Sequence, residues 1–325
     1  MSLVIALTDF LQLAYGSERD LLDRAFRIAT RVLGRNVVET IADVRAVTMA
    51  LDQQHFPTPI LVRFSTADIR FAKINGIDCP VDRNDASVSV PAESSGSWEP
   101  HLVACFRKIC RPGSVAFDIG ANVGYHTLML ATLAGSEGAC YAFEPNSENC
   151  RLILLGSERN NIANIRLMPI ALSDEPGWAY FSMHIGSNGG FVTQHFVASQ
   201  RHCSVVPVFT LDDLSLPDVD LIKVDVEGAE YKVLKGGEAL LSRSRPAIVS
   251  EFSVEMTPRV SAVAPGHYLA WIQSMDYEIY VLDKQSNEPV SIDPVAEFLN
   301  RWGNFTRIED LLFLPREKLD LIGDA

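Results

Sequence analysis

The chain has 325 residues, of which 47% are hydrophobic and 21% charged, and these are the proportions of an ordinary globular protein. This length is sufficient for one large α/β domain or for one domain with a smaller module. The formal net charge of −13 argues against a nucleic-acid partner, because phosphate binding relies on clustered Lys and Arg. No apolar run reaches the roughly 18 residues of a membrane helix, so we predict no membrane span. Six cysteines without a C-x-x-C pair favour reduced thiols and a cytoplasmic protein.

Residues 1–85 are predicted to form a small helical and β-hairpin module. Apolar residues at helical spacing predict helices at 17–34 and 39–51, and alternation predicts strands at 60–64 and at Ile69–Ile74, before a turn at Asn75-Gly76. The module carries no chemical motif, so we expect it to serve substrate or dimer contacts, the latter in a possible homodimer. Residues 81–100 are polar and irregular, and a helix is expected at 101–109.

From residue 115 onward the pattern alternates between strand and helix, which is typical of a doubly wound α/β sheet. We assign residues 86–325 to this domain. The expected strands are Val115–Ile119, Ala139–Phe143, 165–172, 221–226, 247–252, 278–282 and 310–314, with a possible edge segment at 207–209. The expected helices are 125–133, 149–159, one from Gly228 to about residue 241, and 267–275.

Asp118 to Gly124 form a glycine turn between a strand and a helix, with an acid near the strand end. Such a turn lets a ligand approach the backbone beside a helix N-terminus. A dinucleotide fingerprint would require glycines at 122 and 125, where this chain has Asn122 and Tyr125. Asp118 would also repel a pyrophosphate, whereas it suits a sulfonium or ammonium group. The turn therefore favours S-adenosylmethionine over NAD.

Acidic residues end three further predicted strands. Glu144 lies after Ala139–Phe143 and could accept the two ribose hydroxyls of an adenosine ligand. Asp225 and Glu227 follow the strand at 221–226, where either could bind the methionine end of the cofactor, orient the substrate or act as a base. Two converging carboxylates also permit a metal site, but no third ligand is evident and we predict none. Glu251 is a further candidate acid.

Four segments together resemble the FkbM family of S-adenosylmethionine-dependent methyltransferases. They read DIGANVGYHTL from Asp118, AFEPN around Glu144, ALSD from Ala171 to Asp174, and IKVDVEGAEYKVLKGG around Asp225, within residues 98–252. The resemblance implies a Rossmann-like class I methyltransferase sheet of seven strands, flanked by helices, with an antiparallel last strand. The segments 278–282 and 310–314 would form its final hairpin.

The resemblance also implies the roles of individual residues. The methionine half of the cofactor would lie among Asp118, Gly120, Asn122 and Gly124, with Tyr125 beside them. Glu144 would bind the ribose, the segment from Ala171 to Asp174 would flank the adenine, and Asp225 would face the leaving methyl group. Residues 1–85 and an insertion at 283–309 lie outside the matched motifs, and we expect substrate specificity to reside there.

The expected reaction is O-methylation of a hydroxyl on a sugar or secondary-metabolite-type small molecule, by in-line displacement. The candidate bases are Asp225, His126 and Glu227. Three alternatives remain open: N-methylation of a peptide or protein amide, an NAD-dependent oxidoreductase, and a non-catalytic cofactor-binding scaffold.

Overall fold

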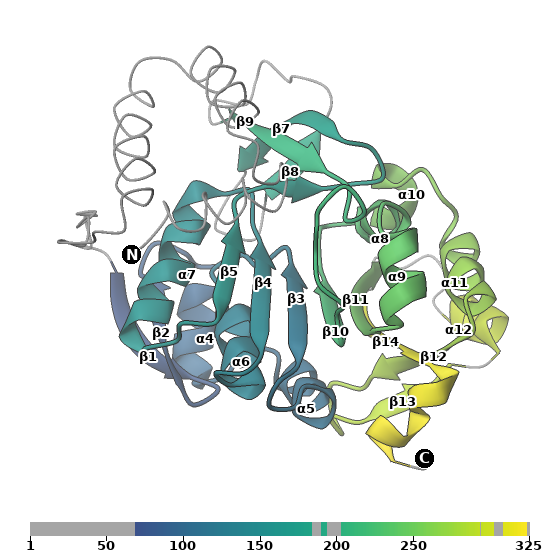
Figure 1. The fold of residues 1–325 in the computed structure, drawn as a ribbon, viewed down its shortest axis with the longest axis horizontal. Helices are drawn as coiled ribbons and strands as arrows, with labels where there is room; N and C mark the ends of the chain where they lie inside the picture. Colours follow the sequence, from purple (N-terminus) through teal and green to yellow (C-terminus); the bar gives the residue numbers. More distant parts are fainter. Residues whose placement is uncertain (1–68, 184–189, 194–202, 293, 302–307, 324–325) are drawn as a thin grey trace. The chain divides into compact units, whose positions relative to one another are not determined.

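The computed structural model describes residues 69–183, 190–193, 203–292, 294–301 and 308–323 (Figure 1). The helices predicted at 17–34 and 39–51 and the strand at 60–64 lie outside these residues. Residues 66–325 form one compact unit. Among the described residues, every helix is too short or too polar to cross a membrane.

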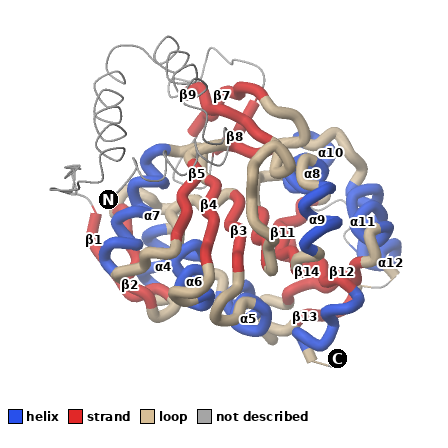
Figure 2. Tube along the Cα trace, viewed as in Figure 1, coloured by secondary structure: helices blue, strands red, loops and turns tan. Residues whose placement is uncertain are grey.

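The main sheet has eight strands, and five adjacent strands within it run parallel to one another (Figure 2). In spatial order they are β13 (Pro289–Ser291), β12 (Tyr277–Leu282), β14 (Ile308–Pro315), β11 (Ala247–Ser253), β10 (Leu221–Val224), β3 (Val115–Ile119), β4 (Ala139–Phe143) and β5 (Ile165–Met168). β14 runs antiparallel to both of its neighbours, β11 and β12. This arrangement confirms the predicted sheet and its final hairpin, and β13 adds one edge strand.

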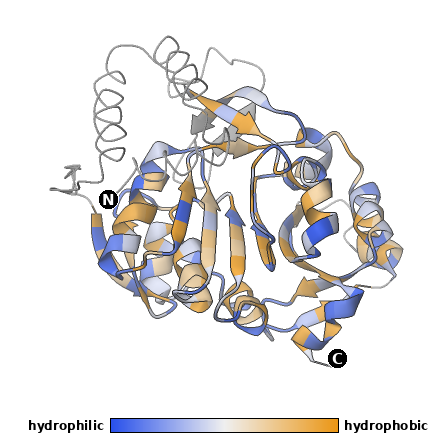
Figure 3. Cartoon of the chain, viewed as in Figure 1, coloured by the Kyte–Doolittle hydropathy of each residue, from blue (hydrophilic) through white to orange (hydrophobic). Residues whose placement is uncertain are grey.

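Helices cover both faces of this sheet, which explains why its strands are largely hydrophobic along their length (Figure 3). One face packs on α5 (Pro100–Ile109), α6 (Tyr125–Ala134) and α7 (Ser147–Arg159), through residues such as Ala116 and Cys140. The other face carries Phe313, whose ring meets Tyr268 of α11 (Pro265–Ser274) edge to face. The remaining helical segments are α8 (Glu230–Lys235), α9 (Glu238–Ser244), α10 (Met256–Val260), α12 (Val295–Arg301) and a 3-10 segment at Arg316–Ile322.

A β-hairpin of β1 (Ile69–Ile74) and β2 (Ile77–Asp82) precedes the sheet, joined by the predicted turn at Asn75-Gly76. It packs on α7, where Asn160 donates to the Asp78 carbonyl at 2.7 Å. The stretch 81–100, expected to be irregular, contains α4 (Ser89–Ser95). Asp85 explains the difference, because its carboxylate accepts hydrogen bonds from the amides preceding and opening the helix, including that of Ser89.

A second, four-stranded sheet interrupts the expected pattern after β5. Its order is β6 (Ala171–Leu172), β9 (Cys203–Phe209), β7 (Gly177–Met183) and β8 (Gly190–Thr193). The strand predicted at 165–172 is therefore two strands in two sheets, because Pro169 has no N–H with which to continue the ladder. The predicted edge segment 207–209 belongs to β9. This sheet lies beyond the carboxyl ends of β3, β4 and β5 (Figure 1).

Candidate functional site

A pocket of about 450 Å³, including its open mouth, lies at the carboxyl ends of β3, β10 and β11. Three parts of the chain form its wall: the segment before α5, the glycine turn with the start of α6, and the ends of β10 and β11. The lining residues are Val88, Trp98, Glu99, Ala121, Asn122, Val123, Tyr125, His126, Lys223, Asp225 and Glu251. Ligands of open α/β sheets bind at this edge.

The glycines of the turn are required by close packing. Gly120 has φ +74°, and a Cβ at this position would lie 1.9 Å from the Asp225 carbonyl oxygen. Gly124 has φ +89°, and its Cβ would lie 2.5 Å from Ile153 of α7. Gly120 therefore brings the turn against the end of β10, whereas Gly124 seats α6 on α7. Asn122 also has a positive φ of 50° and lines the pocket.

Lys223 is a buried cation beneath the glycine turn. Its ammonium donates to the Gly120 carbonyl at 2.9 Å and lies 3.4 Å from carboxylate oxygens of both Asp118 and Asp225. Lys223 and Asp118 are register partners on the parallel strands β10 and β3, which places the two side chains together. The two aspartates hold the pKa of Lys223 above its ordinary value, despite burial, which lowers it. This interaction ties the turn to β10.

Asp118 itself is fully buried and does not line the pocket. Its Oδ2 accepts a hydrogen bond from the Thr127 hydroxyl at 2.5 Å, and its Oδ1 faces Lys223. Asp118 would thus influence the cofactor indirectly, by holding Lys223 and the glycine turn in place.

His126 and Glu99 form a pair in the pocket wall, in which His126 is buried and Glu99 is half-buried. His126 Nε2 lies 2.6 Å from Glu99 Oε2, and the imidazole ring packs edge to face on Phe106. His126 Nδ1 is enclosed and has no hydrogen-bond partner. Burial raises the pKa of Glu99, but the hydrogen bond and charge of His126 outweigh it, so that the pKa lies below its usual value. Glu99 is held in the left-handed region at φ +44°, which is strained for a residue with a side chain.

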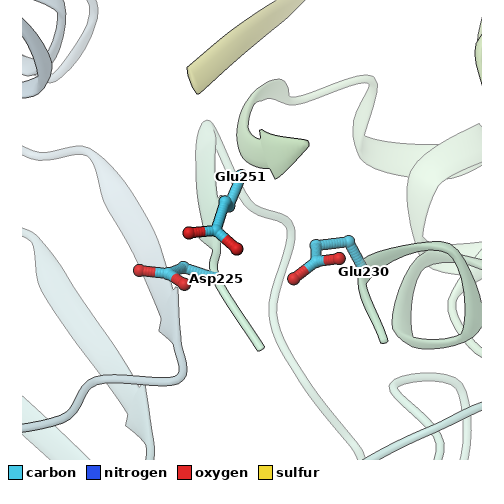
Figure 4. Close-up of side chains that lie close together, drawn as sticks. All are labelled: Asp225, Glu230 and Glu251. Carbon is cyan, nitrogen blue, oxygen red and sulfur yellow. The ribbon is translucent and has the colours of Figure 1, made fainter. Parts of the chain in front are cut away.

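Three carboxyl groups meet at the ends of β10 and β11 and at the start of α8 (Figure 4). Oxygens of Asp225, Glu230 and Glu251 all lie within 4.8 Å of one another. Glu230 accepts hydrogen bonds from the amides of Val226 and Gly228, so it braces the turn before α8. Asp225 and Glu251 line the pocket. Carboxylates in such a group can bind a cation, but an acidic cluster alone does not define a metal centre, and the predicted absence of a metal stays a prediction.

The proximity of these acids changes their protonation. Burial, followed by repulsion from Asp225, Glu230 and Glu227, raises the pKa of Glu251 to about 10. Burial also raises the pKa of Asp225, although Lys223 opposes the change. Glu227, at φ +56°, has a pKa raised to about 7 by burial and then by Asp225, and it does not line the pocket.

Glu144 ends β4, where it was predicted to bind a ribose. Its two oxygens accept from the amides of Asn122 at 2.7 Å and Asn146 at 2.8 Å. Burial raises its pKa to about 7 despite these bonds. Each carboxylate oxygen has a second lone pair, so hydroxyl groups could still bind Glu144.

The remaining predicted residues differ in whether they line the pocket. Tyr125 lines it, with its hydroxyl donating to the Pro80 carbonyl at 3.1 Å. Ala171 is buried in the core of the second sheet, and Asp174 is exposed after β6. Of the predicted site residues, the pocket therefore unites Asn122, Tyr125, His126 and Asp225. The predicted residues that do not line it are Asp118, Gly120, Gly124, Glu144, Ala171, Asp174 and Glu227.

Sequence reasoning missed Glu99, Lys223 and Glu230. Glu99 belonged to a stretch read as a loop, and no local pattern links it to His126. Lys223 did carry a signal, because a lysine inside an apolar strand requires a buried counter-charge and Asp118 interrupts the neighbouring strand in the same way.

The charge of the pocket fits a cofactor that carries positive charge. Glu99, Asp225 and Glu251 line it against Lys223 and the paired His126. Ionised carboxylates attract a sulfonium or an ammonium group and repel a pyrophosphate. This chemistry fits the methionine half of S-adenosylmethionine.

Two curated proteins are similar to this chain. One is the hexuronic acid methyltransferase AglP of Haloferax volcanii, 29% identical over 126 residues, 38% of this chain and 49% of the relative. The other is the 31-O-demethyl-FK506 methyltransferase FkbM of Streptomyces tacrolimicus, 25% identical over 200 residues, 51% of this chain and 76% of the relative. The matched region spans about half the length of the Haloferax protein.

Solved structures of methyltransferases resemble the chain more distantly. A methyltransferase FkbM from Methylobacillus flagellatus KT matches at 15% identity and a TM-score of 0.39, over 64% of this chain and 49% of that one. The model of the methyltransferase FkbM domain matches residues 118–279. That match confirms the resemblance drawn from the motifs, together with the S-adenosylmethionine cofactor class that they implied. The chain carries a methyltransferase domain of the FkbM family.

Proposed function

We propose that this protein is an S-adenosylmethionine-dependent methyltransferase that methylates a hydroxyl group on a sugar or a secondary-metabolite-type small molecule. The observation that carries the proposal is the pocket at the strand ends, where the FkbM-type glycine turn meets Asp225, Glu251 and Lys223. One similar protein is named a hexuronic acid methyltransferase and the other a 31-O-demethyl-FK506 methyltransferase, and the second name supports a hydroxyl acceptor.

In the proposed reaction, S-adenosylmethionine supplies a methyl group already activated on a sulfonium. The chain then has to hold the acceptor oxygen in line with that methyl, and such positioning can contribute roughly 7–11 kcal/mol. Asp225 suits this task because Lys223 fixes its carboxylate at 3.4 Å while the side chain stays 30% exposed to the pocket. A general base contributes less, about 10²–10⁴-fold in rate.

The cofactor contacts expected from the sequence are part of this proposal. Asn122 and Tyr125 would border the methionine half, with Gly120 and Gly124 shaping the turn and Asp118 acting beneath it. Glu144 would bind the ribose, and Ala171 and Asp174 would flank the adenine. His126, a candidate base from the sequence, has its Nε2 engaged by Glu99 and would act as part of the pocket wall.

Assembly and location are proposed more broadly. Residues 1–85 would provide substrate or dimer contacts, and the segment 283–309, which includes β13 and α12, would contribute specificity. We propose a cytoplasmic enzyme, because the buried cysteines at 79, 105, 110, 140 and 150 are free thiols.

The test is transfer of a labelled methyl group. The protein is incubated with methyl-labelled S-adenosylmethionine and a small-molecule and glycan extract, and products are identified by mass spectrometry. We expect one or more hydroxyl compounds to gain a methyl group. Asp225→Asn should lower the labelling by at least about 100-fold if Asp225 positions the acceptor, whereas Asp218→Asn, at an exposed site, should leave it unchanged.

Cofactor binding without labelling in small-molecule, glycan and protein pools would instead support a non-catalytic scaffold. Label recovered in peptide amides would move the assignment to N-methylation.

A further inference from the structure

The proposed reaction leaves one proton to be placed. When the acceptor oxygen bonds to the methyl group, its hydroxyl proton must pass to a nearby base. The titratable groups that line the pocket are Glu99, Tyr125, His126, Lys223, Asp225 and Glu251. The Tyr125 hydroxyl donates to the Pro80 carbonyl. Their contacts distinguish the groups that are already engaged from one that is not.

Four of these groups are occupied by one another. His126 Nε2 is bound to Glu99, and His126 Nδ1 is enclosed, so neither nitrogen is presented to an acceptor. Lys223 lies between Asp118 and Asp225, which keeps it charged and holds Asp225 in place. Within the described part of the chain, the carboxyl group of Glu251 makes no hydrogen bond or ion pair.

The surroundings of Glu251 keep its carboxyl group protonated when no ligand is bound. Its oxygens lie within 4.8 Å of those of Asp225 and Glu230. Two carboxylates at that separation repel each other, and the repulsion is stronger where water is partly excluded. Burial and these neighbours raise the pKa of Glu251 to about 10.

The wider surroundings of Glu251 contribute charges of both signs. On the acidic side, Glu227 and Asp310 add to the repulsion. On the basic side, Lys223 faces Asp225, while His101 and Lys284 lie 2.8 and 3.3 Å from Asp310. These basic groups face other carboxylates, so none of them draws the proton away from Glu251. A protonated carboxyl group cannot act as a base, and a further positive charge in the pocket is needed.

We propose that Glu251 is the group that accepts the proton of the acceptor, and that it becomes available by losing its own proton when a cationic cofactor enters the pocket. This inference rests on the proposed function. The steps balance: one proton leaves Glu251 for solvent on cofactor binding. In the transfer, the O–CH₃ bond forms, the S–CH₃ bond breaks with its electron pair remaining on sulfur, and the acceptor proton moves to the Glu251 carboxylate.

Isothermal titration calorimetry tests the first step without any turnover. S-Adenosylmethionine and S-adenosylhomocysteine, which lacks the sulfonium charge, are each titrated at pH 7 in two buffers of different ionisation enthalpy. We expect close to one more proton released per bound S-adenosylmethionine than per S-adenosylhomocysteine. The affinity for S-adenosylmethionine alone should rise toward about tenfold per pH unit above pH 7.

Two variants assign the proton. Glu251→Gln should abolish the difference between the two ligands and lower methyl labelling by about 100-fold or more. Glu278→Gln, on strand β12, removes a carboxyl group that pairs with Arg316 and should retain both. Subtracting the protons released with Glu251→Gln from those released with the wild type also removes the contribution of the ligands' own amino groups.

Equal proton release for the two ligands in the wild-type protein would overturn the inference, even if Glu251→Gln failed to fold. Full labelling by Glu251→Gln would overturn the assignment of Glu251 as the base. Failure of both ligands to bind would overturn the proposed function and this inference with it, so the two failures are distinguishable.

Discussion

Replacing Lys223 by methionine should destabilise the protein strongly. The ammonium is 4% exposed and has three oxygen partners: the Gly120 carbonyl at 2.9 Å, and Asp118 and Asp225 at 3.4 Å each. Methionine keeps the apolar stem but leaves Asp118 as a buried charge without a cation. Removing one partner of a buried ion pair costs about 3–5 kcal/mol, and we expect the free energy of unfolding to fall by that amount.

Urea unfolding followed by tryptophan fluorescence measures this loss. Lys73→Met serves as the matched control, because Lys73 pairs with Asp78 at 3.2 Å but is 71% exposed, and it should lose less than about 1 kcal/mol. The double variant Lys223→Met/Asp118→Asn removes the stranded charge and should recover about 1–3 kcal/mol. Equal losses for Lys223→Met and Lys73→Met, or no recovery in the double variant, would refute the assigned role of the buried cation.

Three further outcomes are expected. Gly120→Ala should lower the free energy of unfolding by at least about 2 kcal/mol in the same assay, since its Cβ would lie 1.9 Å from the Asp225 carbonyl oxygen; unchanged stability would contradict this packing. Glu144→Ala should weaken S-adenosylmethionine binding by at least about tenfold in calorimetry, through lost hydroxyl contacts; unchanged affinity would remove Glu144 from the cofactor site. Glu251→Gln should raise stability by about 2–4 kcal/mol at pH 8 and by little at pH 5. The reason is that a folded-state pKa of about 10 makes the folded protein retain a proton that the unfolded chain loses above about pH 4.5; a gain independent of pH would contradict it.

The strands that carry the site could be located from the sequence because clear signals bound them. Val115–Ile119 ends at Gly120, and Ala139–Phe143 ends at Glu144-Pro145, and both match the structure. The strand predicted at 165–172 failed because Pro169 was not read as an interruption. The second sheet was missed because β7 and β9 pair across a long separation in sequence, which local alternation cannot reveal.

Residues of the site could be predicted only where the neighbouring sequence, such as the end of a strand, indicates their position. Asp225 directly follows a strand, a position from which we predict that it faces the crevice, and it lines the pocket. Glu99 depends on His126, which lies 27 positions further along the chain, and a contact of that kind has no local pattern. The position of Glu227 outside the pocket wall was equally hidden, because neighbouring residues of a turn point in different directions.

The charge of the pocket has a consequence for the proposed reaction as a whole. Carboxylates that attract a sulfonium also stabilise the state before transfer, and stabilisation of that state alone raises the barrier. Methyl transfer neutralises the sulfur, which would leave Asp225 and Glu251 as adjacent, half-buried charges. If Glu251 accepts the acceptor's proton, the pocket gains one positive charge as the cofactor loses one, so its net charge is constant through the step. The repulsion between Asp225 and Glu251 then favours proton transfer to Glu251. The same two acids therefore lower the barrier to methyl transfer that their tight binding of the cationic cofactor had raised.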